Sequence, residues 1–377
     1  MKMSHRERVI AALSHQQPDR IPLDLGGTRD SSIVVEGYNR LREHFDILSE
    51  PDLTSLMMRV VDVDESILQA LDIDTRGVFP GAPAPIWTDT DRYVDEWGVE
   101  RVKPSSSFYY DQVSFPLAGD VSVRDVVTYP WPEPGDSSRT AGLRSRVEAI
   151  HRPPEYAAVL NLPSAFVHTS QYLRGFEDWF TDLAMNRTLI EALFDAVLEV
   201  SLSICRVLLA EVGREVDVVL ASDDLGFQQG LMVSPEMYRA LIKPRHQRYF
   251  QLIHEMTDAK LLFHTCGSVV DIIDDLIEIG VEALHPVQVS AAGMDPAMLK
   301  QKYGDRLSFW GAVDTHHVLP HGDVDDVTEE VELRIEQLGR EGGYVLGAVH
   351  NIQPDVPLEN VLAMYRHARV YSPSFST

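Results

Sequence analysis

The stretch Lys260-Leu-Leu-Phe-His-Thr-Cys-Gly-Ser268 decides the fold of this chain. Leu261–Phe263 form the apolar run of a short buried strand, and an amphipathic helix is expected soon after it, over Val269–Ile279. Residues two apart in a strand point to the same side. His264 and Cys266 therefore project together where a strand ends and a helix begins. A thiolate beside an imidazole suits Zn²⁺ better than Mg²⁺ or Ca²⁺. The alternative interpretation is a free cysteine that happens to lie near a histidine.

The same succession of strand and helix repeats from Tyr156 onward. Near-continuous apolar strands that alternate with helices indicate a parallel sheet buried on both faces. The predicted strands are Ala157–Leu162, Asp217–Ala221, Lys260–Phe263, Ala283–His285, Leu307–Trp310 and Tyr344–Ala348. The predicted helices are Glu177–Leu183, Thr188–Glu211, Pro235–Glu255 with a kink or split at Pro244, Val269–Ile279, Asp295–Tyr303 and Asp326–Arg340.

Two further strand candidates, near Ile21–Leu25 and Thr75–Phe79, raise the count from six to eight. Eight such units in one chain fit a closed barrel better than an open doubly wound sheet. The open sheet would want a glycine-rich phosphate turn, and Leu25-Gly-Gly-Thr28 is not one. We therefore predict an α/β protein, a single (βα)₈ TIM barrel over residues 1–377. N-terminal helical and hairpin elaborations are expected, including a hairpin at Asp95–Arg101. Ser4, followed three residues on by Glu7, predicts a capping box at the start of an amphipathic helix that runs through Leu13.

Composition restricts the classes of function. The chain has 377 residues, 44% apolar and 24% charged, which is typical of a globular enzyme. Its net charge of −25 repels nucleic acid and anionic lipid, and no apolar run approaches the roughly 18 residues of a membrane helix. The N-terminal residues lack the apolar centre of a signal peptide. The two cysteines, Cys205 and Cys266, cannot form a disulfide framework, so a reducing cytoplasmic location is expected.

Polar side chains follow the strand candidates, and in a TIM barrel the chemistry lies at the carboxyl ends of the strands. One face of the predicted barrel is therefore rich in groups that can bind a metal. In strand order these residues are Asp24 and Arg29; Asn161, His168 and Tyr172; Ser222, Asp223 and Asp224; His264 and Cys266; His285 and Gln288; Asp314 and His316; His350, Asn351, Gln353 and Asp355.

Several of these residues also have a purely structural interpretation. Asp223 and Asp224 suit capping of the next segment as well as catalysis. His285, which precedes a proline, is better explained as a buried core histidine, and Asp314 either caps the following segment or orients a ligand. The loop histidines around His316 are expected to be solvated.

His350 stands apart because Pro354 and Pro357 forbid both a central strand and an immediate helix after it. The residue therefore lies over the mouth of the predicted barrel on a stiff loop. A catalytic zinc site has three protein ligands and one open position, and His350 is a candidate third ligand for His264 and Cys266. A histidine that merely ends a strand is the alternative.

The motifs resemble the uroporphyrinogen decarboxylase superfamily over nearly the whole chain. The likeness is carried by Phe263-His-Thr-Cys-Gly-Ser268, Ala291-Ala-Gly-Met-Asp-Pro296, the run from Gly342 through His350 to Asn360, and the opening Ser4–Pro22. This resemblance implies a single (βα)₈ barrel with the active cleft at its carboxyl face.

Two branches of the superfamily are distinguished by their motifs. True decarboxylases are cofactor-free and hold their substrate with an arginine-rich R-Q-A-G-R-Y segment, whereas Pro22–Asp30 contains only Arg29. His350 is nevertheless similar in position to a decarboxylase histidine. The other branch contains zinc methyltransferases that work with corrinoid proteins and have H-x-C followed by a later C-G-I-P. His264-Thr-Cys266 matches the first motif, and His350-Asn-Ile-Gln-Pro354 replaces the second cysteine with histidine, which zinc tolerates.

The resemblance favours a zinc-dependent methyltransferase that moves a methyl group between a corrinoid protein and a small acceptor or donor, as in O-demethylase systems. The alternatives are a metal-free decarboxylase using His350 with Asp223 or Asp224 as acid and base, and a non-catalytic binder. Substrate and direction of transfer stay open, with a homodimer among the expected assembly states. The predicted residues are His264, Cys266 and His350 as Zn²⁺ ligands, Asp223, Asp224 and His350 in catalysis, and Asn161, Tyr172, Asp314 and Gln353 at the substrate.

Overall fold

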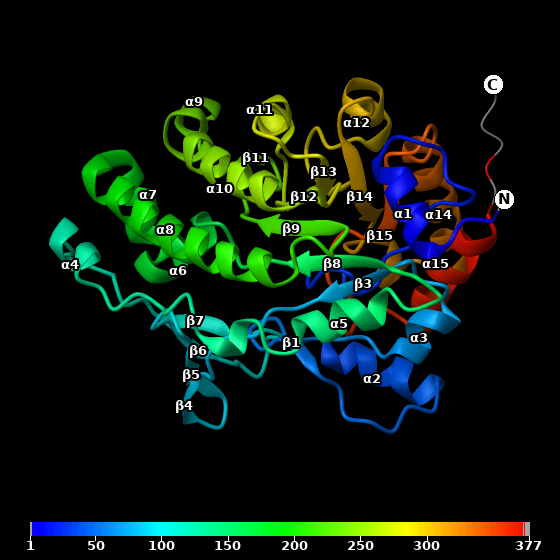
Figure 1. Ribbon diagram of the computed structural model, residues 1–377, viewed down its shortest axis with the longest axis horizontal. Helices are drawn as coiled ribbons and strands as arrows, with labels where there is room; N and C mark the ends of the chain where they lie inside the picture. The colour runs from blue at the N-terminus through cyan, green and yellow to red at the C-terminus, as the bar shows by residue number, and fades with distance from the viewer. Residues whose placement is uncertain (1, 372, 374–377) are drawn as a thin grey trace.

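The computed structural model describes residues 2–371 and 373, and its centre is a curled sheet of seven parallel strands surrounded by helices (Figure 1). The strands lie in the order β15-β14-β13-β12-β9-β8-β3. The six strands predicted after Tyr156 and the strand predicted near Thr75–Phe79 are confirmed. Their bounds are β3 Thr75–Val78, β8 Ala157–Asn161, β9 Val218–Ser222, β12 Lys260–His264, β13 Ala283–His285, β14 Ser308–Val313 and β15 Tyr344–Ala348.

The segment predicted as an eighth strand, Ile21–Leu25, is not a strand of this sheet. It makes one isolated parallel bridge, between Leu23 and Leu346 of β15. On its other side the backbone nitrogen of Asp74, which precedes β3, donates to the Leu23 oxygen at 2.9 Å. The segment therefore lies between the two ends of the curled sheet. Pro22 has no amide proton to donate, which limits its pairing.

The inward-facing side chains of the sheet form a small core of their own. Val159, Leu220 and Leu262 belong to it, together with apolar residues of α1, which spans His5–Leu13. The predicted capping box starts α1, since the Glu7 amide donates to the Ser4 hydroxyl and the Ser4 amide to the Glu7 carboxylate. Helix α1 thus packs against the inner face of the sheet.

The remaining helices pack on the outer face of the sheet or in the N-terminal region. Of the helices that the structure describes, none combines the length and apolar character needed to cross a bilayer. Their bounds are α2 Val35–His44, α3 Glu65–Ala70, α4 Val123–Val127, α5 Leu143–Ile150, α6 Val167–Arg174, α7 Phe176–Met185, α8 Arg187–Val212, α9 Pro235–Met237, α10 Lys243–Met256, α11 Ile273–Glu278, α12 Pro296–Tyr303, α13 Val318–His321, α14 Val324–Leu338 and α15 Leu358–Val370.

Two predicted helices contain a turn that is not α-helical. The helix expected over Val269–Ile279 begins as a 3₁₀ turn, Val270–Ile272, and becomes α11 only at Ile273. The helix expected over Pro235–Glu255 is split as predicted: a π-helical turn, Tyr238–Ile242, separates α9 from α10. Pro244 lies in the first turn of α10, where its missing amide proton costs nothing.

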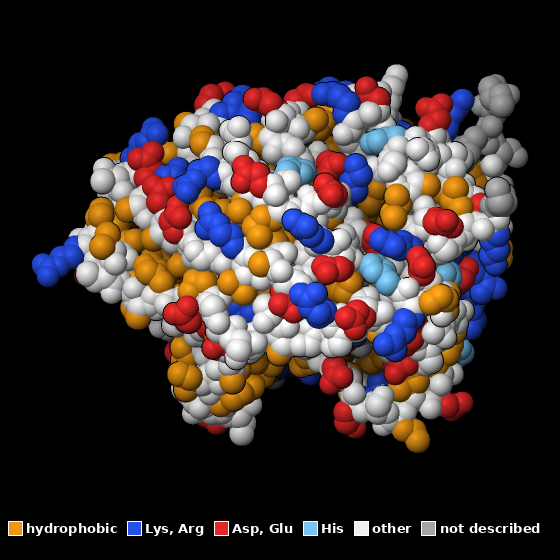
Figure 2. All heavy atoms as spheres, viewed as in Figure 1, with side chains coloured by type: hydrophobic (Ala, Val, Ile, Leu, Met, Phe, Trp, Pro, Cys, Tyr) orange, Lys and Arg blue, Asp and Glu red, His pale blue; other side chains and the backbone are white. Residues whose placement is uncertain are grey.

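Short antiparallel strands form the predicted elaborations. The four-stranded sheet β4-β5-β6-β7 projects from the body as a lobe, on which Figure 2 shows hydrophobic side chains gathered. The predicted hairpin at Asp95–Arg101 is the turn between β5 and β6, with Gly98 at φ 76°. The short strands are β1 Leu53–Ser55, β2 Val60–Val61, β4 Ile86–Asp89, β5 Arg92–Val94, β6 Glu100–Val102, β7 Asp111–Ser114, β10 Gly226–Phe227 and β11 Gly230–Leu231.

A buried carboxylate ties the N-terminal segments to the sheet. Asp74 accepts hydrogen bonds from Arg8 Nη1 at 2.5 Å, Arg20 Nη1 at 2.6 Å and the Leu23 amide at 2.7 Å, and lies 2.8 Å from His5 Nδ1. Burial opposes ionisation of Asp74, but His5, Arg20 and Arg8 together lower its pKa below the usual value. The network therefore joins α1, the segment around Leu23 and the start of β3.

We predict that Asp74→Asn destabilises the protein by about 3–5 kcal/mol at pH 7, because it leaves buried guanidinium groups without their charge partner. Since the folded pKa of Asp74 is lowered, this stability is present above the unfolded carboxyl pKa of about 4 and is lost as the pH falls further. Urea unfolding at pH 7 and at acidic pH measures both effects.

The matched control is Asp72→Asn, which removes a carboxylate that is 35% exposed and also pairs with Arg20. An exposed pair of this kind is worth about 0–1 kcal/mol. Equal losses of stability in the two variants would contradict the importance of the buried network.

Candidate functional site

The carboxyl ends of the parallel strands bring His264 and Cys266 to the inner side of the sheet. His264 is the last residue of β12 and is paired in register with Ser222 of β9 and His285 of β13. It has the same parity along the strand as the inward-facing Leu262, so its ring lies on the inner side. Cys266 follows the strand, and its Sγ lies 3.5 Å from His264 Nε2.

His350 joins this pair from the loop after β15. One ligand atom each from His264, Cys266 and His350 lies within 4.8 Å of the others, and the two imidazole centroids are 5.6 Å apart. In a tetrahedral zinc site with bonds of about 2.1 Å to nitrogen and 2.3 Å to sulfur, the N–S edge is about 3.6 Å. The His264–Cys266 distance matches this edge. The donor set and spacing therefore fit a metal ion such as zinc, provided that His350 moves slightly closer to His264 and Cys266.

The turn that presents Cys266 is fixed by close backbone packing. Gly267 has φ 84°, and a Cβ on it would lie 2.4 Å from the carbonyl carbon of Gly226. The Cys266 amide donates to Asp224 Oδ1 at 2.7 Å, and the Gly267 amide donates to Gln288 Oε1 at 2.7 Å. The glycine is required here because two backbone segments approach each other, and this approach sets the direction of the thiol.

His285, predicted as a core histidine, is buried and contacts the ligand His264. Their Nδ1 atoms are 2.7 Å apart. Burial and the neighbouring His264 and His350 lower the pKa of His285 well below its usual value, so its imidazole is neutral at pH 7. A neutral His285 can accept a hydrogen bond from His264 Nδ1–H, which leaves His264 Nε2, the atom near Cys266, free for a metal.

Two carboxylates flank the three candidate ligands. Asp30 lies 3.6 Å from His264 Nδ1 and 4.0 Å from His350 Nε2, and Asp224 lies 3.6 Å from His264 Nε2. Burial, Asp224 and Asp30 raise the pKa of the Cys266 thiol well above its usual value. The thiol therefore stays protonated unless a cation joins the site, and a bound metal would displace its proton.

Asp224 also pairs with His168, at 3.1 Å between Oδ2 and Nε2. The ring of His168 stacks on Tyr172, with centroids 5.8 Å apart. Burial opposes the charged form, but Tyr172 and Asp224 raise the pKa of His168 well above its usual value. His168 is therefore a proton donor at neutral pH.

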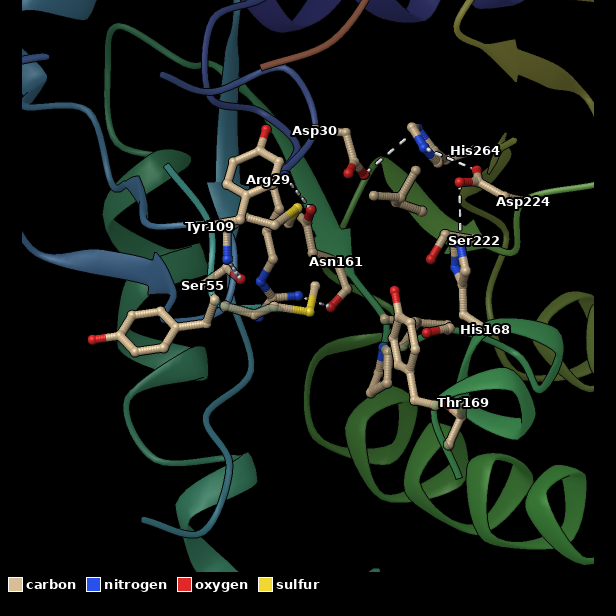
Figure 3. Close-up of a pocket in the computed structure, with 18 of the residues that line it drawn as sticks. Arg29, Asp30, Ser55, Tyr109, Asn161, His168, Thr169, Ser222, Asp224 and His264 are labelled. Carbon is tan, nitrogen blue, oxygen red and sulfur yellow. Dashed lines mark hydrogen bonds and ion pairs between the residues drawn. The ribbon is translucent and has the colours of Figure 1, made fainter. Parts of the chain in front are cut away.

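These groups face a cleft of about 430 Å³ between the sheet and the projecting lobe (Figure 3). The lobe supplies aromatic groups to the cleft, and the turn between β1 and β2 supplies the thioethers of Met57 and Met58. Most of the acidic and imidazole groups come from the strand ends and from the segment that holds Asp30. The lining residues are Arg29, Asp30, Ser55, Met57, Met58, Trp97, Tyr109, Tyr110, Asp111, Gln112, Asn161, Leu162, Pro163, Ser164, His168, Thr169, Tyr172, Leu220, Ser222, Asp224, His264 and His350.

The predicted substrate contacts divide into two groups. Asn161 and Tyr172 line the cleft. Gln353 is set back from it and donates to the hydroxyl of Tyr109, a lining residue, at 2.6 Å. Asp314 caps the loop after β14, where it accepts from the His316 amide at 2.6 Å, and it is not a lining residue. A substrate contact by Asp314 stays a prediction.

The two adjacent aspartates, both predicted as catalytic, have different surroundings. Asp224 lines the cleft, whereas Asp223 is buried and is not among the lining residues. Asp223 accepts from three backbone amides at the start of α6 and from the His246 ring. The catalytic role of Asp223 stays a prediction.

Sequence reasoning did not select Asp30, His168 and Tyr109 as site residues. His168 follows a predicted strand, so its place on the polar face was a usable signal. Asp30 belongs to an irregular segment, and Tyr109 comes from the lobe, at the far end of the β6–β7 connection. Tyr109 lines the same cleft as His264 and His350, and burial together with the nearby Asp30 and Cys266 raises its pKa to about 12.

Comparisons with known proteins agree with this architecture. The family model described as uroporphyrinogen decarboxylase (URO-D) matches residues 157–371. A solved methyltransferase from Methanosarcina mazei matches with a TM-score of 0.68 and 19% sequence identity, over 97% of this chain and 98% of that chain. A β-glucosidase mutant derived from a hyperthermophilic tetrameric structure matches with a TM-score of only 0.43 and 10% identity, over 95% and 97%. No curated protein sequence matches the chain.

We predict that Gly267→Ala destabilises the protein by about 3 kcal/mol or more, because the added methyl group overlaps the Gly226 backbone at an unfavourable φ. Gly230→Ala in the adjacent β10–β11 hairpin is the control, since a Cβ there meets nothing within 4 Å. This control is expected to change stability by about 0.5 kcal/mol or less. Urea unfolding compares the two, and an unaffected Gly267→Ala protein would contradict the close packing of this turn.

Proposed function

The chain belongs to the uroporphyrinogen decarboxylase family, and within that family we propose that it is a zinc-dependent methyltransferase. It would move a methyl group between a corrinoid protein and a small acceptor or donor, as in an O-demethylase system. The observation that carries this proposal is the convergence of His264, Cys266 and His350 on one point beside a cleft. The shared fold with an archaeal methyltransferase supports it.

We also propose that residues 1–377 form one (βα)₈ barrel domain, in which the segment Ile21–Leu25 completes the curled sheet. On the β15 side Leu346 donates to Pro22 and accepts from Asp24, and on the β3 side Leu23 accepts from Asp74. These hydrogen bonds on both sides of the segment support this completion. A corrinoid protein, a small-molecule substrate, a homodimeric assembly and a cytoplasmic location belong to the same proposal.

The metal would be held by His264 Nε2, the Cys266 thiolate and His350. Bound Zn²⁺ supplies Lewis-acid activation of the heteroatom that carries or receives the methyl group. Burial lowers the pKa of His350 against an opposing effect of Asp30, which favours the neutral imidazole that ligates metals. Asp30 and Asp224 balance the positive charge that the site acquires.

His168 would supply the proton that the reaction needs. If a methyl ether gave up its methyl group to a corrinoid carried by a partner protein, the electrons of the broken C–O bond would stay on the oxygen. His168 then protonates that oxygen, and its ion pair with Asp224 keeps it charged until that moment. In the opposite direction, neutral His168 would accept the proton of the methyl acceptor.

The remaining cleft residues would bind and orient the small molecule. Tyr172 offers an aromatic face beside His168, and Asn161 is held by the Arg29 amide at 2.9 Å. Tyr109, which receives the hydrogen bond of Gln353, would close the cleft on the lobe side. These contacts would hold the reacting group next to the candidate ligands and away from bulk water.

The alternative is a metal-free decarboxylase that uses His350 and Asp224 as acid and base, which the description of the family favours. Among the described lining residues Arg29 is the only arginine or lysine, and its guanidinium donates to backbone oxygens of Thr54, Asn161 and Pro80. A substrate with several carboxylates would find little cationic support there. Activity that survives Cys266→Ser would favour this alternative.

We predict that the purified protein binds one zinc ion per chain. Cys266→Ser and His350→Ala are expected to weaken zinc binding by more than about 100-fold, because each removes a direct ligand rather than an outer hydrogen-bond partner. Elemental analysis gives the stoichiometry, and competition with a chromophoric chelator gives the affinity.

Cys205→Ser is the matched control for the thiol. Cys205 is buried in α8 and does not belong to the candidate ligand group, so this variant should retain zinc. Absence of stoichiometric zinc, or equal affinity in the wild type and Cys266→Ser, would end the zinc proposal.

We further predict that methyl-ether cleavage is constant through neutral pH and falls only at alkaline pH, because the raised pKa of His168 keeps it protonated. His168→Gln should lower the rate by about 10²–10⁴-fold and abolish the alkaline fall. The assay mixes zinc-loaded protein with cob(I)alamin and a panel of methyl ethers, and follows methylcob(III)alamin by its visible spectrum. An identical pH profile in the variant would exclude His168 as the proton donor.

A further inference from the structure

Two consecutive carboxylates at the end of β9 hold opposite ends of one residue. Asp224 faces the cleft, and its carboxylate pairs with Nε2 of the His168 ring. Asp223 is 0% exposed, and its Oδ1 accepts from the backbone nitrogen of the same His168 at 3.0 Å. The two residues therefore act on His168 from the ring side and from the backbone side.

Asp223 fixes the whole start of α6. Its Oδ2 accepts from the amides of Phe166 and Val167, each at 3.0 Å. The first amides of a helix have no intrahelical partner, and Phe166, at the N-cap, cannot cap them with its apolar side chain. Asp223, which directly follows the neighbouring strand β9, accepts hydrogen bonds from these amides instead. The position of α6 is therefore coupled to the carboxyl end of β9.

His246 of α10 is the fourth partner of this carboxylate, with Nε2 3.1 Å from Asp223 Oδ2. Both side chains are 0% exposed. The His246 ring stacks on Phe250 and packs against Phe166 and Phe263, with centroid distances of 5.1–5.4 Å. Its Nδ1 has no partner among the described residues, which favours the tautomer with the proton on Nε2.

We propose that Asp223 and His246 are a positioning pair for His168. His246 holds the Asp223 carboxylate in one orientation, Asp223 holds the start of α6, and the helix in turn sets the His168 ring against Asp224. The pair does not touch the cleft. Its importance for catalysis rests on the proposed function of His168, but the positioning itself does not.

This pair differs from an ordinary helix cap. A serine or aspartate at the N-cap itself would satisfy the same amides without burying a carboxylate and an imidazole, both of which lose solvation. This loss of solvation is explained if the orientation of α6 must be fixed relative to Asp224. The titratable groups that act on His168 are Tyr172 on α6 itself and Asp223 and Asp224 after β9.

The test is NMR titration of the His168 imidazole in the full chain, with ¹³C-labelled histidine and assignment by His168→Gln. His246→Phe removes the donor and keeps a ring in the aromatic surroundings, whereas His246→Gln keeps a donor at the position of Nε2. We expect His246→Phe to lower the pKa of His168 by about 1 or more, because the His168–Asp224 pair separates. We expect His246→Gln to leave it within about 0.3 of the wild type, given that the donor is preserved.

The sign of the change separates positioning from simple electrostatics. If α6 stays in place, loss of the His246 donor leaves the Asp223 charge less compensated, and the pKa of His168 stays constant or rises. That result in folded His246→Phe would overturn the proposal. If His246→Phe does not fold, the titration is repeated with His246→Leu, which also removes the donor. Failure of all three variants to fold would also overturn it, because the pair would then be needed for folding rather than placement.

His151→Phe is the control, since His151 is 21% exposed and its partner is Asp217, 3.4 Å away. It should leave the titration of His168 unchanged. The measurement is made on zinc-free and zinc-loaded protein alike. If His246→Phe lowers the pKa of His168 but the protein binds no zinc, the positioning pair is therefore upheld and the proposed function fails.

Discussion

The parallel register of β9, β12 and β13 is the constraint on which the site depends. It sets His264 level with Ser222 and His285, so the residues that leave these strands start from one edge of the curled sheet. Parallel strands end on the same side, and a curled sheet turns those ends toward a common centre. The polar groups converge there, while apolar residues and α1 fill the inner side below them.

The convergence brings together groups whose charges depend on one another. Asp30 is buried and Asp224 is partly buried beside His264, and a carboxylate that has lost much of its solvation needs a positive partner. His168 supplies one such charge to Asp224. The neutral thiol of Cys266 and the neutral ring of His285 supply none, so the site has a natural place for a cation. The proposed binding of a cation such as zinc is therefore supported by charge balance as well as by the donor set.

The projecting lobe gives the site its second wall. Tyr109 and Trp97 line the cleft opposite the strand ends, although neither follows a strand of the parallel sheet. The hydroxyl of Tyr109 donates to Asn351 Oδ1 at 3.1 Å, next to His350. The lobe is thereby attached to the same loop that carries a candidate ligand, and the shape of the cleft depends on both.

Local pattern was enough to predict the strands after Tyr156, the capping box at Ser4, the break before Pro244 and the polar strand ends that carry His264, Cys266 and His350. Each follows from short-range steric or hydrogen-bonding preferences, and the family resemblance supplied the zinc interpretation. Only the folded chain decides that Asp224 faces the cleft while Asp223 faces α10. The fold also decides that Asp30 lies beside two candidate ligands, that Tyr109 contacts the loop after β15, and that Ile21–Leu25 forms a single bridge. Those outcomes depend on the curvature of the sheet and the packing of distant segments, which no local pattern encodes.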